Sequence, residues 1–151
     1  MVKVDNIIAF PGCAVIDPDT KPAPILTGSD YGRIEVLRQQ IHRALLCQRC
    51  NLDRACEMIS GDRATSVSQA SLLLFALLKE HGTHAVTFYR PGAQEFSSAE
   101  IWISRVLRAV QHGDERQADA LIAWRIEPIG RRRARFLIGR LLDSFLERDA
   151  A

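Results

Sequence analysis

Seven consecutive apolar residues run from Leu72 to Leu78. A helix that is apolar on all sides has no face for water, so this run predicts a helix buried in the centre of the fold. Helix signals flank the run. Ser66 and Gln69 have the spacing of a capping box, and Gly82 lies where a residue in the left-handed conformation would end the helix. We therefore expect a buried central helix over residues 66–81. The run is too short to cross a bilayer, which takes about 20 residues.

Before the central helix, apolar positions that recur with the helical period predict two further helices. The first begins near Asp30, a favourable N-cap residue, and ends near Cys50. The second is short. Its apolar face includes Leu52 and Ile59, and Gly61 ends it.

Three helices are expected after the central one. The first opens with a capping box at Ser97 and ends at Gly113. The next is capped by Asp114 and ends at Pro128, and the short link between the two predicts antiparallel neighbours. The last spans residues 130–147 and has the most regular amphipathic pattern in the chain.

Two segments do not follow the helical pattern. Four of the six prolines fall within residues 1–28, which predicts an irregular N-terminal arm, because proline fixes φ and lacks an N–H donor. Residues 84–90 alternate apolar and polar positions and predict an extended segment, for which only the arm offers a strand partner. The expected fold is all-α: a compact bundle of about six helices, forming one domain over residues 29–151 and preceded by the arm.

The composition is that of an ordinary globular protein. Of the 151 residues, 47% are hydrophobic and 25% are charged, which is enough to build a core. The net charge of +2 is well below the basic bias of a dedicated nucleic-acid-binding protein. The first residues lack a signal-peptide pattern, and we expect a cytoplasmic protein without membrane contact whose four cysteines are reduced.

Three cysteines, Cys47, Cys50 and Cys56, form the pattern C-x2-C-x5-C where the first two predicted helices meet. Zinc takes four ligands, and Cys13 or His42 could supply the fourth. No second cysteine pair exists, however, and Cys56 occupies an apolar helix position, where a thiol acts as a small hydrophobe. We favour structural thiols, with a zinc site or a redox pair as the alternatives.

Four arginines, Arg131, Arg132, Arg133 and Arg135, occupy the first turns of the last predicted helix. A helix N-terminus carries partial positive charge, which disfavours each cation there by about 0.3–1 kcal/mol. A bound phosphate or carboxylate would compensate, because it meets free N–H groups and guanidinium donors together. The run therefore predicts an acidic protein partner or nucleic acid. The alternative is a solvated surface, with some arginines paired to acids of a neighbouring helix.

Enzyme motifs are missing from the sequence: it has no P-loop, dinucleotide-binding, nucleophile-elbow or zinc-protease motif. A helix-turn-helix over residues 52–81 is disfavoured, because its second helix offers leucines where base recognition needs polar side chains. We expect a non-enzymatic regulatory or adaptor protein without a cofactor, which binds another protein or a second copy of itself. A nucleic-acid-binding transcriptional regulator that uses the basic start of the last helix is one alternative, and a cysteine-based metal or redox sensor is the other.

Overall fold

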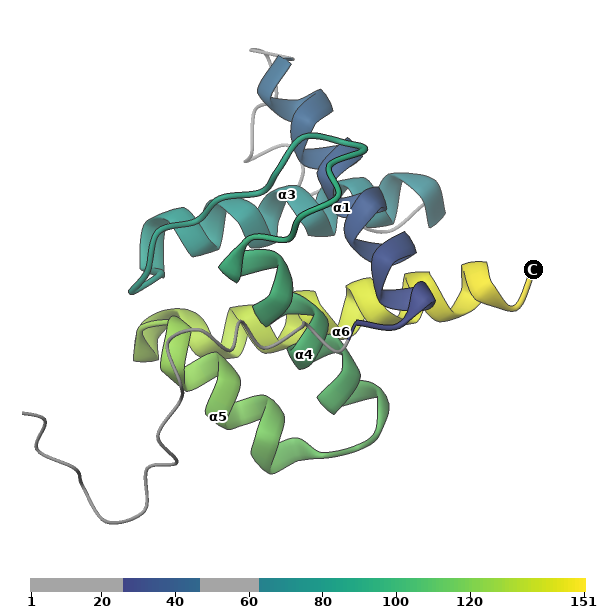
Figure 1. Cartoon of the computed structure of the whole chain (residues 1–151). Coiled ribbons are helices and arrows are strands. Elements are labelled where there is room, and N and C mark those ends of the chain that lie inside the picture. The colour runs from purple at the N-terminus through teal and green to yellow at the C-terminus, as the bar shows by residue number, and fades with distance from the viewer. Residues whose placement is uncertain (1–25, 47–62) are drawn as a thin grey trace, which may run out of the picture.

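The computed structural model describes residues 26–46 and 63–151. This part of the chain forms five α-helices and no strand, which confirms the predicted all-α class. The number of helices is five instead of about six, and the short helix predicted over residues 52–60 lies outside the described residues, as does the N-terminal arm. The helices are α1 (Gly28–Leu46), α3 (Arg63–His81), α4 (Ser98–Gln111), α5 (Glu115–Arg125) and α6 (Pro128–Asp149) (Figure 1).

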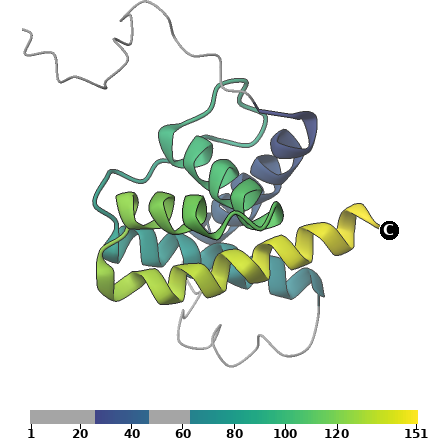
Figure 2. The same ribbon diagram turned by 90° about the horizontal axis from the view of Figure 1, so that it is seen from below.

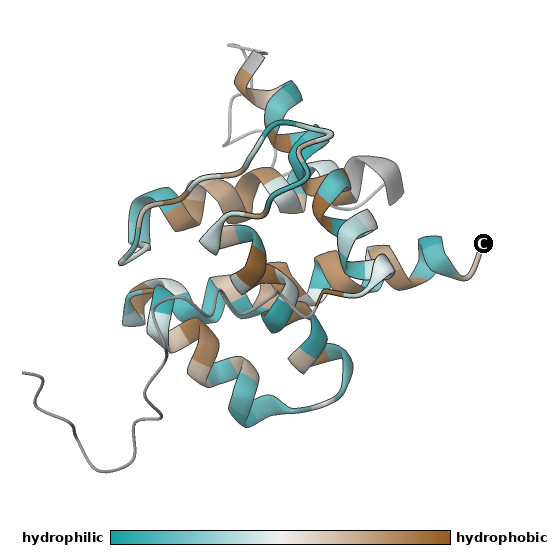
Figure 3. Ribbon diagram, in the orientation of Figure 1, coloured by the Kyte–Doolittle hydropathy of each residue, from teal (hydrophilic) through white to brown (hydrophobic). Residues whose placement is uncertain are grey.

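Helices α3 and α6 pack against each other along much of their length. They lie side by side and run in opposite directions in both views (Figures 1 and 2). α4 and α5 fold back on each other and pack on α6, while α1 packs on α3 and α4. Hydrophobic stretches are visible on α3, α4 and α6, whereas the link between α4 and α5 is hydrophilic (Figure 3).

The core is built mainly from α3, α4 and α6. The contributing residues recur every three or four positions on each helix, so each helix buries one face. The central members are Leu74, Leu77, Leu78, Trp102, Ile103, Val106, Leu107, Ala134, Leu137, Ile138, Leu141 and Phe145.

α3 is central, but it is not enclosed on every side as the apolar run predicted. Leu74, Leu77 and Leu78 are buried, whereas residues 72–73 and 75–76 are half-buried. The helix also begins at Arg63, so Ser66 lies inside it and the predicted capping box is wrong. The physical reason is that arginine and alanine are good helix formers, and no helix breaker separates Arg63 from Ser66.

Gly82 ends α3, but for a reason other than the predicted left-handed conformation. Positive φ occurs only at Gly92 and Gly113 among the described residues. Gly82 instead forms an isolated antiparallel bridge with Ile126, and a Cβ atom at Gly82 would collide with the carbonyl oxygen of Leu78. Close backbone contact therefore requires glycine here.

The predicted boundaries of α4 and the predicted start of α5 are confirmed, whereas α5 ends at Arg125, before the predicted Pro128. Ser97 and Glu100 form the capping box of α4, and Gly113 follows this helix with a φ of 72°. The side chain of Asp114 caps α5 by accepting a hydrogen bond of 3.0 Å from the N–H of Gln117. The short link thus lets the two helices pack together, as expected.

The starts of α1 and α6 differ from prediction by two residues. α1 begins at Gly28, and Asp30 lies inside its first turn, where its carboxylate accepts a 2.9 Å hydrogen bond from the N–H of Thr27. Asp30 therefore closes the turn from within the helix instead of acting as the N-cap. α6 begins at Pro128, since proline suits a first-turn position that needs no N–H donor.

Truncation of a core residue on α6 is expected to destabilise the protein much more than truncation of a residue on its outer side. Ile138 is fully buried and Ile129 is 78% exposed. We expect Ile138→Ala to cost about 2–5 kcal/mol, and Ile129→Ala to change the free energy of unfolding by no more than about 0.5 kcal/mol. Urea unfolding measures both. Equal losses would contradict the orientation of α6.

Candidate functional site

Arg131 is one of the four arginines predicted to bind an anion, and it contacts α5. Its Nε donates to the carbonyl oxygen of Ile126 at 2.9 Å, and its Nη2 donates to that of Ala123 at 3.3 Å. These carbonyls lie at the negative C-terminal end of α5, which favours a cation. The cost of placing Arg131 at the start of α6 is therefore offset within the protein.

Arg135 also contacts α5, through acidic side chains. Its guanidinium pairs with the carboxylate of Glu115 and donates to Oδ1 of Asp119 at 3.0 Å. Both acids are mostly exposed, so each pair adds little stability. This arrangement matches the solvated-surface alternative for this arginine.

Arg132 and Arg133 are different, because they are exposed and have no hydrogen-bond or ion-pair partner within residues 26–46 and 63–151. Ile129 and Phe136, which are 78% and 58% exposed, lie one turn to either side of them. Residues three or four apart share one side of a helix. We call these four residues the α6 outer face: Ile129, Arg132, Arg133 and Phe136.

The two apolar members of the α6 outer face were not among the predicted site residues. A signal for them exists in the sequence, because Ile129 and Phe136 are seven residues apart and out of phase with the apolar pattern of α6. Large apolar residues that miss the core face must lie on the surface. Arg140 follows one turn later and is half-buried, with no hydrogen-bond partner for its Nε in the described part of the chain.

A buried ion pair joins α1 to the start of α4. Nε and Nη2 of Arg38 donate to the two carboxylate oxygens of Glu100 at 2.8 Å and 2.9 Å, and both side chains are fully buried. The guanidinium also donates to the carbonyl oxygens of Ala93 and Glu95. Glu100 accepts further hydrogen bonds from the N–H groups of Tyr89 and Ser97. Because the partners satisfy one another, we assign this pair a structural role.

The pKa of Glu100 reflects this network. Burial alone raises the pKa, but the hydrogen bonds from Arg38 and from the backbone of Ser97 and Tyr89 favour the charged form more strongly. The pKa of Glu100 therefore lies below its ordinary value of 4.5.

Arg125 is a second buried arginine, and it positions the segment that follows α3. Its Nη2 donates to the carbonyl oxygen of Ala85 at 2.8 Å, and the guanidinium lies 5.6 Å from the ring centre of Trp102. Burial lowers the pKa of Arg125. The indole N–H of Trp102 donates to the carbonyl oxygen of Leu121, whereas the side chain of Trp124 is exposed.

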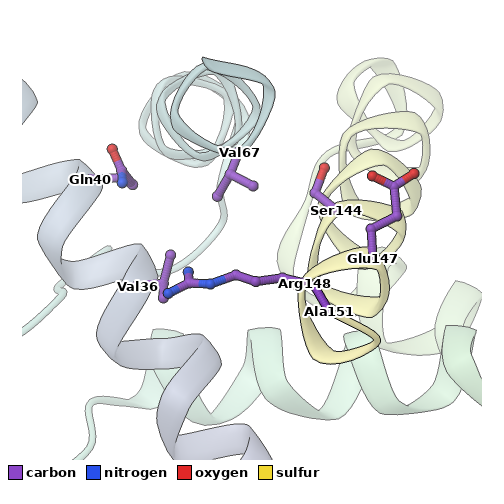
Figure 4. A pocket seen from close by; sticks show the side chains of 7 residues that line it. All are labelled: Val36, Gln40, Val67, Ser144, Glu147, Arg148 and Ala151. Carbon is purple, nitrogen blue, oxygen red and sulfur yellow. The ribbon is translucent and has the colours of Figure 1, made fainter. Parts of the chain in front are cut away.

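A groove of about 350 Å³ lies between α1 and α6, close to the start of α3 (Figure 4). Val36 and Val67 supply apolar walls, and the side chain of Arg148 extends across the groove toward Val36. Ser144 donates its hydroxyl proton to the carbonyl oxygen of Arg140, so it is committed to the helix backbone. The groove thus has room for an apolar group. Among its described lining residues, the hydroxyl of Ser144 is hydrogen-bonded to the backbone and not to a base such as Glu147.

The predicted metal ligands lie mostly outside the described residues. This applies to Cys47, Cys50, Cys56 and Cys13, and the fifth candidate, His42, is exposed on α1. Within residues 26–46 and 63–151, no three His, Cys, Asp or Glu side chains are grouped so that they could hold a metal ion. The zinc hypothesis therefore stays a prediction.

None of the described helices has the length and apolar character needed to cross a membrane. Comparison with protein-family models, curated proteins and solved structures finds no match to this chain.

Removal of the charge on Glu100 is expected to destabilise the protein in a pH-dependent way. Glu100→Gln leaves the buried guanidinium of Arg38 with only the more distant carboxylate of Glu35, at 3.7 Å, as a counter-charge. We expect this loss to cost about 3–5 kcal/mol at pH 7. Because the folded pKa of Glu100 is lowered, its contribution is present above pH 4.5 and is lost as the pH falls through the folded value. The stability difference between wild type and variant should therefore narrow on acidification.

Urea unfolding at pH 7 and at a pH below 4.5 measures this difference. Glu95→Gln is the control, since the side chain of Glu95 is exposed and only its backbone carbonyl contacts Arg38. A loss for Glu100→Gln that is the same at both pH values would contradict the electrostatic assignment.

Proposed function

We propose that this protein is a non-enzymatic adaptor that binds an acidic segment of another protein through the α6 outer face. The observation that carries the proposal is the contrast among the four arginines. Arg131 and Arg135 contact α5, whereas Arg132 and Arg133 lie without a partner in the described residues between two exposed apolar side chains.

The chemistry of the partner follows from that arrangement. The guanidinium group of arginine binds a carboxylate through two parallel hydrogen bonds. The N-terminal turns of α6 also favour anions, because a helix N-terminus carries partial positive charge. Ile129 and Phe136 flank the arginines and offer apolar contact area. The complementary surface is an amphipathic segment, with acidic side chains opposite Arg132 and Arg133 and apolar side chains opposite the two ends.

The energetics also favour a protein partner. Arginine and aromatic residues are enriched among the few interface residues whose truncation costs about 1 kcal/mol or more. Single exposed apolar residues are normal on a protein surface, but here two of them share one helix face with two exposed arginines. The groove between α1 and α6 has no comparable set of cations, since Arg148 is the only arginine among its described lining residues.

A charge-reversal experiment tests the proposal. A photo-crosslinking amino acid at position 136 first identifies the segment that contacts the α6 outer face, and the affinity of that segment is then measured. We expect Arg132→Glu with Arg133→Glu to weaken binding by about 100-fold, since removal of each charge pair at an interface costs at least about 1.4 kcal/mol.

The matched control is Arg105→Glu with Arg116→Glu, which changes the net charge equally at two exposed arginines on α4 and α5. The control should change the affinity by less than about threefold. Equal losses in both variants, or capture of a segment without acidic residues, would overturn the proposal.

Nucleic acid is the second candidate for the same surface. It is favoured by the two exposed arginines at a helix start beside an exposed aromatic ring, because bases stack on such rings. Arg131 is less suited to the test, since its removal would also take hydrogen bonds from the end of α5.

Salt titration of oligonucleotide binding distinguishes this candidate. If it is correct, Arg132→Ala with Arg133→Ala should lower the affinity and reduce the slope of log K against log salt by about 0.9 for each phosphate that is no longer neutralised. An unchanged affinity and slope would exclude nucleic acid as the ligand of the α6 outer face.

A further inference from the structure

The segment between α3 and α4 runs back along α3 in an extended conformation over residues 85–90 (Figure 1). Its side chains alternate as in a β-strand. Val86 and Phe88 pack against the core, whereas Thr87 and Tyr89 are exposed. The centre of the Phe88 ring lies 5.9 Å from the centre of the Phe75 ring on α3. The prediction of an extended segment is therefore confirmed.

The backbone hydrogen bonds of this segment fall on alternate residues. Arg125 donates to the carbonyl oxygen of Ala85, Ser97 donates through its hydroxyl to that of Thr87, and the N–H of Tyr89 donates to Glu100. In a strand, the N–H and C=O of one residue point to the same edge, and the next residue points to the opposite edge. Residues 85, 87 and 89 therefore face the edge that α4 and α5 cover.

Val86 and Phe88 must then direct their N–H and C=O groups toward the other edge. Their backbone groups have no hydrogen-bond partner within the described part of the chain. Backbone polar groups are almost always paired in native proteins. The free edge is short, because Arg90 enters a turn in which its carbonyl oxygen accepts from Ala93.

The composition of this edge does not protect it from pairing. Natural edge strands are commonly guarded by charged residues, proline or a bulge. Residues 85–89, Ala-Val-Thr-Phe-Tyr, contain neither a charge nor a proline, and all but the alanine are residue types that favour strands.

We propose that this edge pairs with the same edge of a second copy of the chain, antiparallel about a two-fold axis at Thr87. In that register Val86 lies opposite Phe88 of the other copy, and the two residues exchange both N–H···O bonds. The two-fold axis generates a second such pair, Phe88 opposite Val86 of the other copy. All the N–H and C=O groups of Val86 and Phe88 that point away from α4 and α5 are then hydrogen-bonded. Two-fold dimers are the commonest protein oligomers, and such an interface must be self-complementary.

The side chains suit the same register. Thr87 lies opposite its own copy as a non-hydrogen-bonded pair, in which side chains come close and threonine pairs are favourable. On the inner side, the apolar pairs of Val86 and Phe88 extend the contact that Phe88 already makes with Phe75. This surface is separate from the α6 outer face, so the inference does not depend on the proposed function.

Cysteine crosslinking in the full chain tests the register. In the proposed dimer the Cα atoms of residue 87 are about 4.5 Å apart, whereas those of residue 89 are about 14 Å apart, and a disulfide spans at most about 7 Å. We expect Thr87→Cys to form the 87–87 disulfide at least about tenfold faster than Tyr89→Cys forms an 89–89 disulfide.

Both substituted side chains are exposed, so neither variant should unfold. Wild type gives the background from the four native cysteines, and peptide mapping identifies the disulfide. Equal crosslinking at positions 87 and 89, or none at 87, would overturn the register.

Hydrogen exchange on the wild-type chain gives a second measurement that needs no substitution. The amides of Val86 and Phe88 should become protected as the protein concentration rises, while that of Thr87 should stay unprotected. Protection of Val86 and Phe88 that does not vary with concentration would show that another segment of the same chain covers the edge. Absence of protection at all concentrations would show that the edge is free. Either result would reject the dimer.

Discussion

The buried ion pair between Arg38 and Glu100 joins α1, α4 and the chain between α3 and α4. Arg38 comes from α1, and its guanidinium also holds the chain between α3 and α4 through two backbone carbonyls. Glu100 completes the capping box of α4 and receives the N–H of Tyr89. One carboxylate thus closes a helix end, neutralises a buried cation and orients an extended segment. Such a pair is tolerated in the interior only because every charged group has partners.

The orientation of the extended segment follows from the same pair. Once Tyr89 donates to Glu100, alternation along the strand directs Val86 and Phe88 to the opposite edge. Their side chains are tied to the core at the same time, so the segment cannot rotate to bury its free backbone groups. The internal constraint that stabilises α1 and α4 therefore also leaves one edge of the extended segment without a hydrogen-bond partner in the described residues.

α6 has separate roles on its different sides. Its inner side supplies the largest share of the core against α3. Its lateral arginines, Arg131 and Arg135, bind α5 and offset the unfavourable position of cations at a helix start. Arg132 and Arg133 project from the remaining side beside Ile129 and Phe136. The proposed binding surface therefore consists of α6 residues that pack against neither the core nor α5.

The sequence by itself determined the all-α class, the boundaries of α4, the start of α5, and the extended character of residues 85–90, because these depend on local signals. Side-chain caps at Ser97 and Asp114, and the strand-like alternation around Thr87, act over a few residues. Only the tertiary structure decided which arginines of the basic run are paired, and that Arg38 meets Glu100. Those contacts join a side chain of one helix to groups of another, and periodicity carries no information about which faces of different helices meet. The same limit applies at Gly82, whose antiparallel bridge with Ile126 could not be predicted from the local glycine signal.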